Sequence, residues 1–130
     1  MEQENSSKSP PPAAIPLVLI RSKEAYRLWH NAIIHLNRVD RYTTGAKIDE
    51  IFLALVELIF VGCYAHDKFE KLSIVTRAIG KCDLLKFFLQ LGWEQKIIDR
   101  KMYAELIILL DEVGRMLGGW KKSLADKTRS

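Results

Sequence analysis

The distribution of proline constrains the fold of this chain more than any other feature. All four prolines lie within the first sixteen residues, and residues 21–130 contain none. Because proline removes a backbone donor and breaks helix interiors, a proline-free stretch of this length favours long helices. We therefore expect a flexible, polyproline-like tail at residues 1–20, a folded domain at 21–124 and a short flexible tail at 125–130.

Apolar residues recur every three or four positions through the proline-free part, which is the spacing of one helix face. This periodicity predicts four helices, at about residues 22–39, 43–65, 70–91 and 99–122. Ser22, Thr43 or Thr44, and Asp99 are the expected N-caps of the first, second and fourth helices. Short connections make consecutive helices antiparallel, so the sequence predicts an all-α, up-down-up-down four-helix bundle.

Two of the predicted helices carry more apolar surface than one bundle core needs. The extra positions are Leu53, Val56 and Phe60 in the second helix, and Leu106, Ile108 and Leu109 in the fourth. Large exposed apolar patches usually mark an interface, so we expect a homo-oligomer. The alternative is that each of these helices touches two neighbours at once, which widens its apolar arc.

The chain has a formal net charge of +4, and some of its cations share helix faces. Lysines and arginines at helical spacing can follow a phosphate backbone with salt-sensitive affinity. The candidate nucleic-acid-binding residues are Arg77 and Lys81, then Arg115, Lys121 and Lys122, then Arg38 and Arg41. Lys23 and Arg27 add positive charge to the first helix. The alternative is a set of solubilising surface cations paired with Glu24, Glu70, Asp83 and Asp111.

The sequence contains no motif typical of catalysis or of cofactor binding. It has no supported Ser/His/Asp or Cys/His arrangement and no phosphate-binding glycine loop. We expect neither enzymatic activity nor a cofactor. A metal or thiol site at Cys63, His66 and Cys82 is the enzymatic alternative. We expect these cysteines to pack as small apolar side chains instead, with His66 at a helix end.

The amino terminus and the cysteines bear on the compartment. The first residues, MEQE, do not resemble the basic start of a signal peptide, and the apolar segment at 15–20 is too short to span a membrane. Two cysteines within apolar segments favour reduced thiols. We expect a cytoplasmic protein that does not contact membranes.

Three segments resemble one protein family. Residues 110–120 (LDEVGRMLGGW), 41–49 (RYTTGAKID) and 64–68 (YAHDK) are similar to the accessory variability determinant (Avd) proteins of diversity-generating retroelements. That family belongs to a four-helix-bundle group that includes proteins encoded in ribosomal RNA intervening sequences. The similarity covers about residues 25–123. In physical terms, Gly114 allows close helix approach, and Gly118-Gly119 followed by Trp120 reads as a helix stop with a packing anchor.

The resemblance implies a homopentameric barrel of four-helix bundles with basic surfaces. It also implies that the chain binds a reverse transcriptase and template RNA or cDNA. In this role the protein supports mutagenic retrohoming, in which adenine-specific errors are copied from a template repeat into a variable repeat. The candidate cations would then form the nucleic-acid surface. The alternative function is a structural or interaction bundle of the intervening-sequence type, without a polymerase partner.

Overall fold

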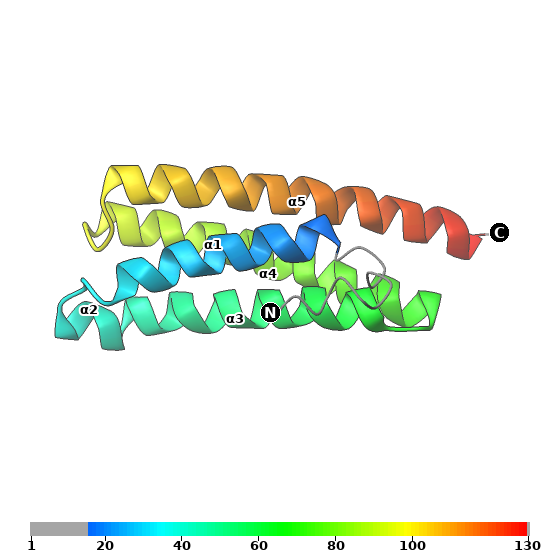
Figure 1. Cartoon of the computed structure of the whole chain (residues 1–130), viewed down its shortest axis with the longest axis horizontal. Helices are drawn as coiled ribbons and strands as arrows, with labels where there is room; N and C mark the ends of the chain where they lie inside the picture. Colours follow the sequence, from blue (N-terminus) through cyan, green and yellow to red (C-terminus); the bar gives the residue numbers. More distant parts are fainter. Residues whose placement is uncertain (1–15, 130) are drawn as a thin grey trace, which may run out of the picture.

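The computed structural model describes residues 16–129, with side chains described to residue 127. This part of the chain contains five helices and no strand, which confirms the all-helical prediction (Figure 1). The helices are α1 (Leu17–Ile33), α2 (Arg38–Tyr42), α3 (Thr44–Tyr64), α4 (Lys68–Glu94) and α5 (Arg100–Arg129). Residues 1–15, most of the expected amino-terminal tail, lie outside the described residues.

The first helix begins five residues earlier than the sequence predicts, so the predicted cap at Ser22 is wrong. Pro16 precedes α1, and Val18 and Leu19 in its first turn are buried. Burial of these two side chains explains why the helix includes residues assigned to the tail. Ser22 is buried inside α1, and its hydroxyl donates a hydrogen bond to the Leu19 carbonyl over 2.9 Å.

The predicted first helix is also divided near its end. α1 stops at Ile33, and a separate helix, α2, begins after Asn37. Leu36 in the connection is buried. The Asn37 side chain accepts a hydrogen bond from the backbone N–H of Asp40 over 2.8 Å, which caps α2. The chain thus turns at Leu36, since its side chain enters the core.

The last helix continues beyond the predicted stop. The predicted cap of α5 is confirmed, because Asp99 accepts a hydrogen bond from the N–H of Met102 over 2.8 Å. The predicted end near residue 122 is wrong, since α5 passes through Gly118 and Gly119 to Arg129. No described glycine has a positive φ, the conformation of a glycine helix stop. Leu124 is buried, so the extra turns carry a core contact.

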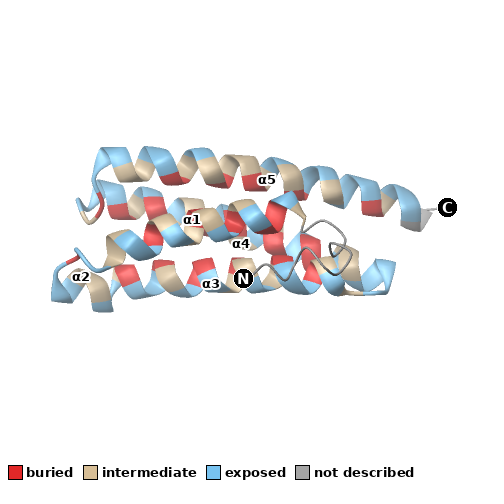
Figure 2. Ribbon diagram, viewed as in Figure 1, coloured by how far each residue is buried: buried red, intermediate tan, exposed pale blue. Residues whose placement is uncertain are grey.

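The four long helices lie side by side, and the chain reverses direction at each connection between them (Figure 1). α1 packs on α3 and α5, α4 packs on the same two helices, and α2 packs on α3. Buried residues follow the inward side of each long helix (Figure 2). The largest fully buried side chains include Trp29, Phe52, Leu55, Leu85, Leu89, Leu106, Leu110 and Leu117.

One polar contact joins α1 to α3 beside this core. The Asp49 carboxylate accepts hydrogen bonds from the Tyr26 hydroxyl over 2.9 Å and from the Trp29 indole N–H over 3.1 Å. Both rings also contact Phe52. Burial is the largest cause that raises the pKa of Tyr26 to about 12, and the hydrogen bond to Asp49 adds to the rise.

Two glycine substitutions test the course of α5 and the turn at α2. Gly118→Ala should raise the free energy of unfolding by about 0.5–1 kcal/mol, because the helix is continuous there and no atom lies within 4 Å of the added methyl group. Gly45→Ala should destabilise the protein, since its methyl group would lie 2.7 Å from the Asp40 carbonyl oxygen. Urea unfolding measures both. A destabilising Gly118→Ala would contradict the continuous helix.

Candidate nucleic-acid interface

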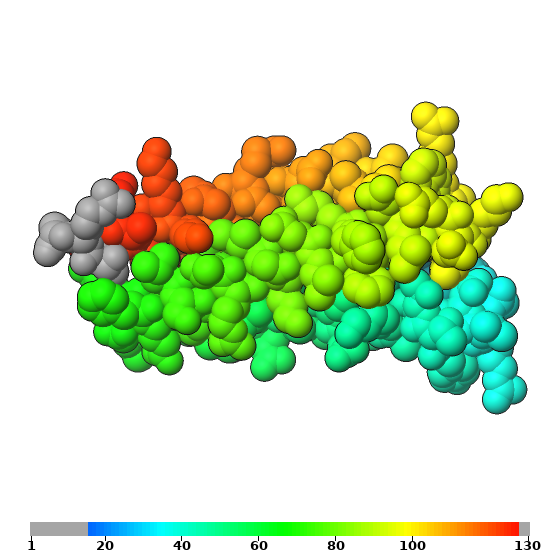
Figure 3. Space-filling view, turned by 180° about the vertical axis from the view of Figure 1, so that it is seen from behind, coloured from blue at the N-terminus to red at the C-terminus, as the bar shows by residue number. Residues whose placement is uncertain are grey.

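Arg77 and Lys81 lie one turn apart on α4, on the side that faces α3. Arg77 is exposed and lines a shallow hollow with Glu57 and Glu70, while Lys81 is half-buried. Figure 3 shows this part of the surface, with α4 running between α5 and α3. The two cations are therefore on one helix edge, as predicted from their spacing, but carboxylates lie near them.

The predicted cations of α5 lie on exposed positions in the second half of the helix. Arg115, Lys121 and Lys122 are all exposed. Arg115 lines a hollow of about 270 Å³ between α4 and α5, next to Lys86 and Asp111. Because this hollow is between α4 and α5, Arg115 faces the edge of α4 that is opposite the edge carrying Arg77.

The remaining two predicted cations lie in α2, at the end of the molecule away from the carboxyl terminus (Figure 1). Arg38 is exposed. Arg41 donates hydrogen bonds to the carbonyl oxygens of Ile34 and Leu36, each over 3.1 Å. Its guanidinium thus holds the turn between α1 and α2. The structure therefore distributes the seven predicted residues over three places rather than one patch.

None of these seven cations forms an ion pair with a carboxylate among the described residues. Of the four acids expected to pair with them, Glu24 binds Arg21 over 3.0 Å and Asp111 binds Lys86 over 3.3 Å. No ion pair is formed by Glu70 or Asp83 within residues 16–127. The five exposed candidates keep their charged groups available to a polyanion, and they are Arg38, Arg77, Arg115, Lys121 and Lys122.

A further basic edge, which is not among the predicted binding residues, lies between α1 and α3. Lys23, Arg27 and His30 line a hollow of about 310 Å³ with Tyr26, Leu53 and Val56. No carboxylate is among these lining residues, unlike the hollow next to Arg77. The spacing of these three basic residues, at i, i+4 and i+7, is the sequence signal that could have predicted this edge.

The structure also places the residues considered for metal or thiol chemistry. No group of three His, Cys, Asp or Glu side chains within the described part of the chain is arranged to hold a metal ion. Cys82 is buried between α4 and α5, where its thiol contacts the Leu110 carbonyl over 3.6 Å and burial raises its pKa to about 11. Cys63 lies in a different hollow, near Trp120, and burial raises its pKa too.

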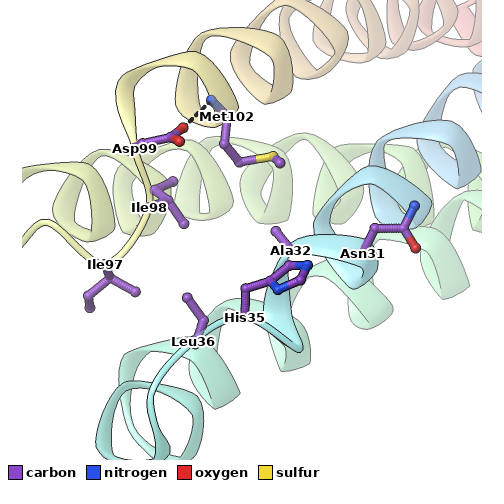
Figure 4. A pocket seen from close by; sticks show the side chains of 8 residues that line it. All are labelled: Asn31, Ala32, His35, Leu36, Ile97, Ile98, Asp99 and Met102. Carbon is purple, nitrogen blue, oxygen red and sulfur yellow. Dashed lines mark hydrogen bonds between the residues drawn. The ribbon is translucent and has the colours of Figure 1, made fainter.

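A hollow of about 450 Å³ lies between the α1–α2 connection and the α4–α5 turn (Figure 4). Asn31, His35, Asp99 and Met102 line it together with apolar side chains. Asp99 is engaged in capping α5, as the dashed line in Figure 4 shows. The residues that line this hollow do not place a nucleophile beside a base.

Comparison with known families decides the classification of the chain. The model of the family described as bAvd-like matches residues 20–124, which is most of the sequence. The chain belongs to the bAvd-like family. No curated protein matches the chain. The resemblance to accessory variability determinant proteins is thereby confirmed, and the family is of an accessory, non-catalytic type.

The closing segment of this bAvd-like chain, residues 110–120, has a structural role that differs from the one predicted from the sequence. A methyl group at Gly114 would meet Lys86 Nζ at 3.7 Å and Cys82 Sγ at 3.9 Å, which are ordinary contacts. Gly114 is thus not needed for close packing of α4 and α5. Trp120 stays in the helix and packs on α3, where a Cβ at Gly62 would lie 3.3 Å from its ring. Nothing within the described chain explains Gly118 and Gly119.

Finally, within residues 16–129 none of the helices combines the length with the apolarity that crossing a lipid bilayer requires.

Proposed function

We propose that this protein is a non-catalytic accessory subunit of a diversity-generating retroelement. In this role it acts in the cytoplasm and binds the element's reverse transcriptase and its template RNA or cDNA, which supports mutagenic retrohoming. The observation that carries the proposal is the family match over residues 20–124. The surface chemistry described above supports it, because exposed cations without ion-pair partners suit a polyanion.

Binding to the nucleic acid would be electrostatic. Among the described residues, Arg77 and Lys81 on one edge of α4, and Arg115 and Lys122 on α5, form no ion pairs. Cations that neutralise phosphates release counterions, so the affinity falls as salt rises and depends little on sequence. Nearby Glu57, Glu70 and Asp83 reduce the local potential. We therefore expect that several copies acting together bind better than one.

The nucleic-acid part of the proposal predicts a charge-reversal result. Arg77→Glu with Lys81→Glu should largely abolish binding of a labelled single-stranded RNA or DNA and reduce the salt slope by about 1 for each lost phosphate contact. Fluorescence anisotropy between about 50 and 200 mM salt measures this. The matched control is Arg100→Glu with Lys101→Glu, an exposed pair with the same charge change.

A third variant, Lys23→Glu with Arg27→Glu, compares the basic edge of α1 with that of α4. Loss of binding in this variant alone would move the interface to the α1–α3 hollow. Equal losses in all three variants would mean that only net charge matters. Insensitivity to salt and to Arg77→Glu with Lys81→Glu would contradict the proposed nucleic-acid surface.

Assembly into a homopentameric barrel is the second part of the proposal. On the outer side of α3, Leu53, Phe60 and Tyr64 are exposed, the last two at 52% and 56%. This apolar stripe is bordered by Glu57 on the α4 side and by the Lys23 edge on the α1 side. Apolar surface of this kind is costly to leave in water, so it suits contact with another subunit.

A closed ring also needs a second, different patch on each subunit, because its contacts are head-to-tail. α4 offers exposed apolar side chains for this purpose. Leu84 and Phe87 lie three residues apart on α4 and are 37% and 59% exposed. We assign the α3 stripe and this α4 patch to the two sides of the subunit contact.

This assignment predicts which substitutions break the assembly. Leu53→Glu with Phe60→Glu should convert the protein to smaller species, because the α3 stripe would carry buried, unpaired charges at the contact. Ile108→Glu is the control with a single added charge, since Ile108 is an exposed apolar residue on α5, outside the assigned face. Sedimentation velocity measures the distribution of species. Unchanged sedimentation of the double variant, or an equal effect of Ile108→Glu, would contradict the assigned face.

A further inference from the structure

A hollow of about 380 Å³ opens where the described chain begins. It lies between the start of α1, the end of α3 and the second half of α5. Its lining residues are Pro16, Leu17, Val18, Cys63, Met116 and Trp120. None of these carries a formal charge, so the hollow suits an apolar occupant.

The aromatic wall of this hollow is held in place by the end of α3. Lys71 Nζ donates hydrogen bonds to the carbonyl oxygens of Gly62 over 2.9 Å and of Cys63 over 3.1 Å. The same ammonium group lies 5.9 Å from the centre of the Trp120 ring, within range of a cation–π contact. The ring also packs against Gly62. The hollow is therefore preformed rather than created by its occupant.

The sequence that leads into the hollow favours an extended backbone. Pro16 lines the hollow, and its φ of −56° and ψ of 135° fall near the polyproline II region. The preceding segment, residues 9–15, reads SPPPAAI. A residue before proline is directed away from the helical region, which applies to Ser9, Pro10, Pro11 and Ile15. With three residues per turn in polyproline II, Pro12 and Ile15 share one edge.

We propose that this hollow is the docking site of the chain's own residues 10–15, with Pro12 and Ile15 as the apolar anchors next to Trp120. Aromatic-walled apolar grooves are a recurring way to bind polyproline II segments, whose extended shape costs little entropy to fix. The segment is joined to the wall through Pro16, so its effective concentration is high and a weak contact suffices. The occupant precedes residue 20, where the family match begins, and the docking is independent of the proposed role in a retroelement.

Cys63 reports on the hollow, and Cys82 provides an internal reference elsewhere in the core. The full chain is treated with N-ethylmaleimide at mildly alkaline pH, and the rate at each cysteine is followed by mass spectrometry. Pro12→Ser with Ile15→Ser should raise the rate at Cys63 by about fivefold or more and leave Cys82 unchanged, because a covered site reacts in proportion to its open fraction. Ala13→Ser with Ala14→Ser is the matched control on the other two edges of the segment, with an expected change within about twofold.

Three results would overturn the docking. One is an unchanged rate at Cys63 in Pro12→Ser with Ile15→Ser. Another is an equal rise at Cys82, which would assign the effect to unfolding. The third is protection of Cys63 that grows with protein concentration, which would mean that a second copy covers the hollow. Protection that is independent of concentration and lost only with Pro12 and Ile15 supports it.

Discussion

Burial of one continuous apolar stripe on each of four helices is the constraint on which the rest of this structure depends. Each long helix packs on two neighbours, so no helix covers its own stripe without both of them. This requirement sets the helix bounds. α1 reaches back to Leu17 because Val18 and Leu19 are buried, and α5 reaches past Gly119 because Leu124 is. In both places, burial outweighs a local signal, which is a serine cap worth about 1 kcal/mol in α1 and two glycines that cost about 1 kcal/mol each in α5.

The balance between core burial and local signals also explains which helices and caps could be predicted from the sequence. Apolar periodicity predicted the four long helices, because the apolar positions recur in the sequence at three- and four-residue spacing. The cap at Asp99 was also predictable, since an Asx cap acts over three residues. The turn at Leu36 was not, because it arises from a side chain entering a core that other helices form. Likewise, Gly118 and Gly119 resemble a helix stop when they are considered alone, but burial of Leu117 and Leu124 stabilises the helix around them.

The candidate cations show the same difference between features local to one helix and features that depend on packing. Spacing predicted correctly that Arg77 and Lys81 share an edge of α4, because that geometry is local to one helix. It did not show that Arg115 lies at the contact between α4 and α5 or that Arg41 holds a turn, since both depend on packing between helices. The spacing of Lys23 and Arg27 was also visible in the sequence, but the apolar wall next to them is supplied by the packing of α1 on α3.

The central claim is that this bundle works as an assembled, non-catalytic scaffold of the bAvd-like family. Multi-angle light scattering of the full chain tests it most directly, because the method reports mass without assumptions on shape. We predict one species with about five times the 15.0 kDa of a single chain, maintained on dilution. A clean monomer across the whole concentration range would contradict the account.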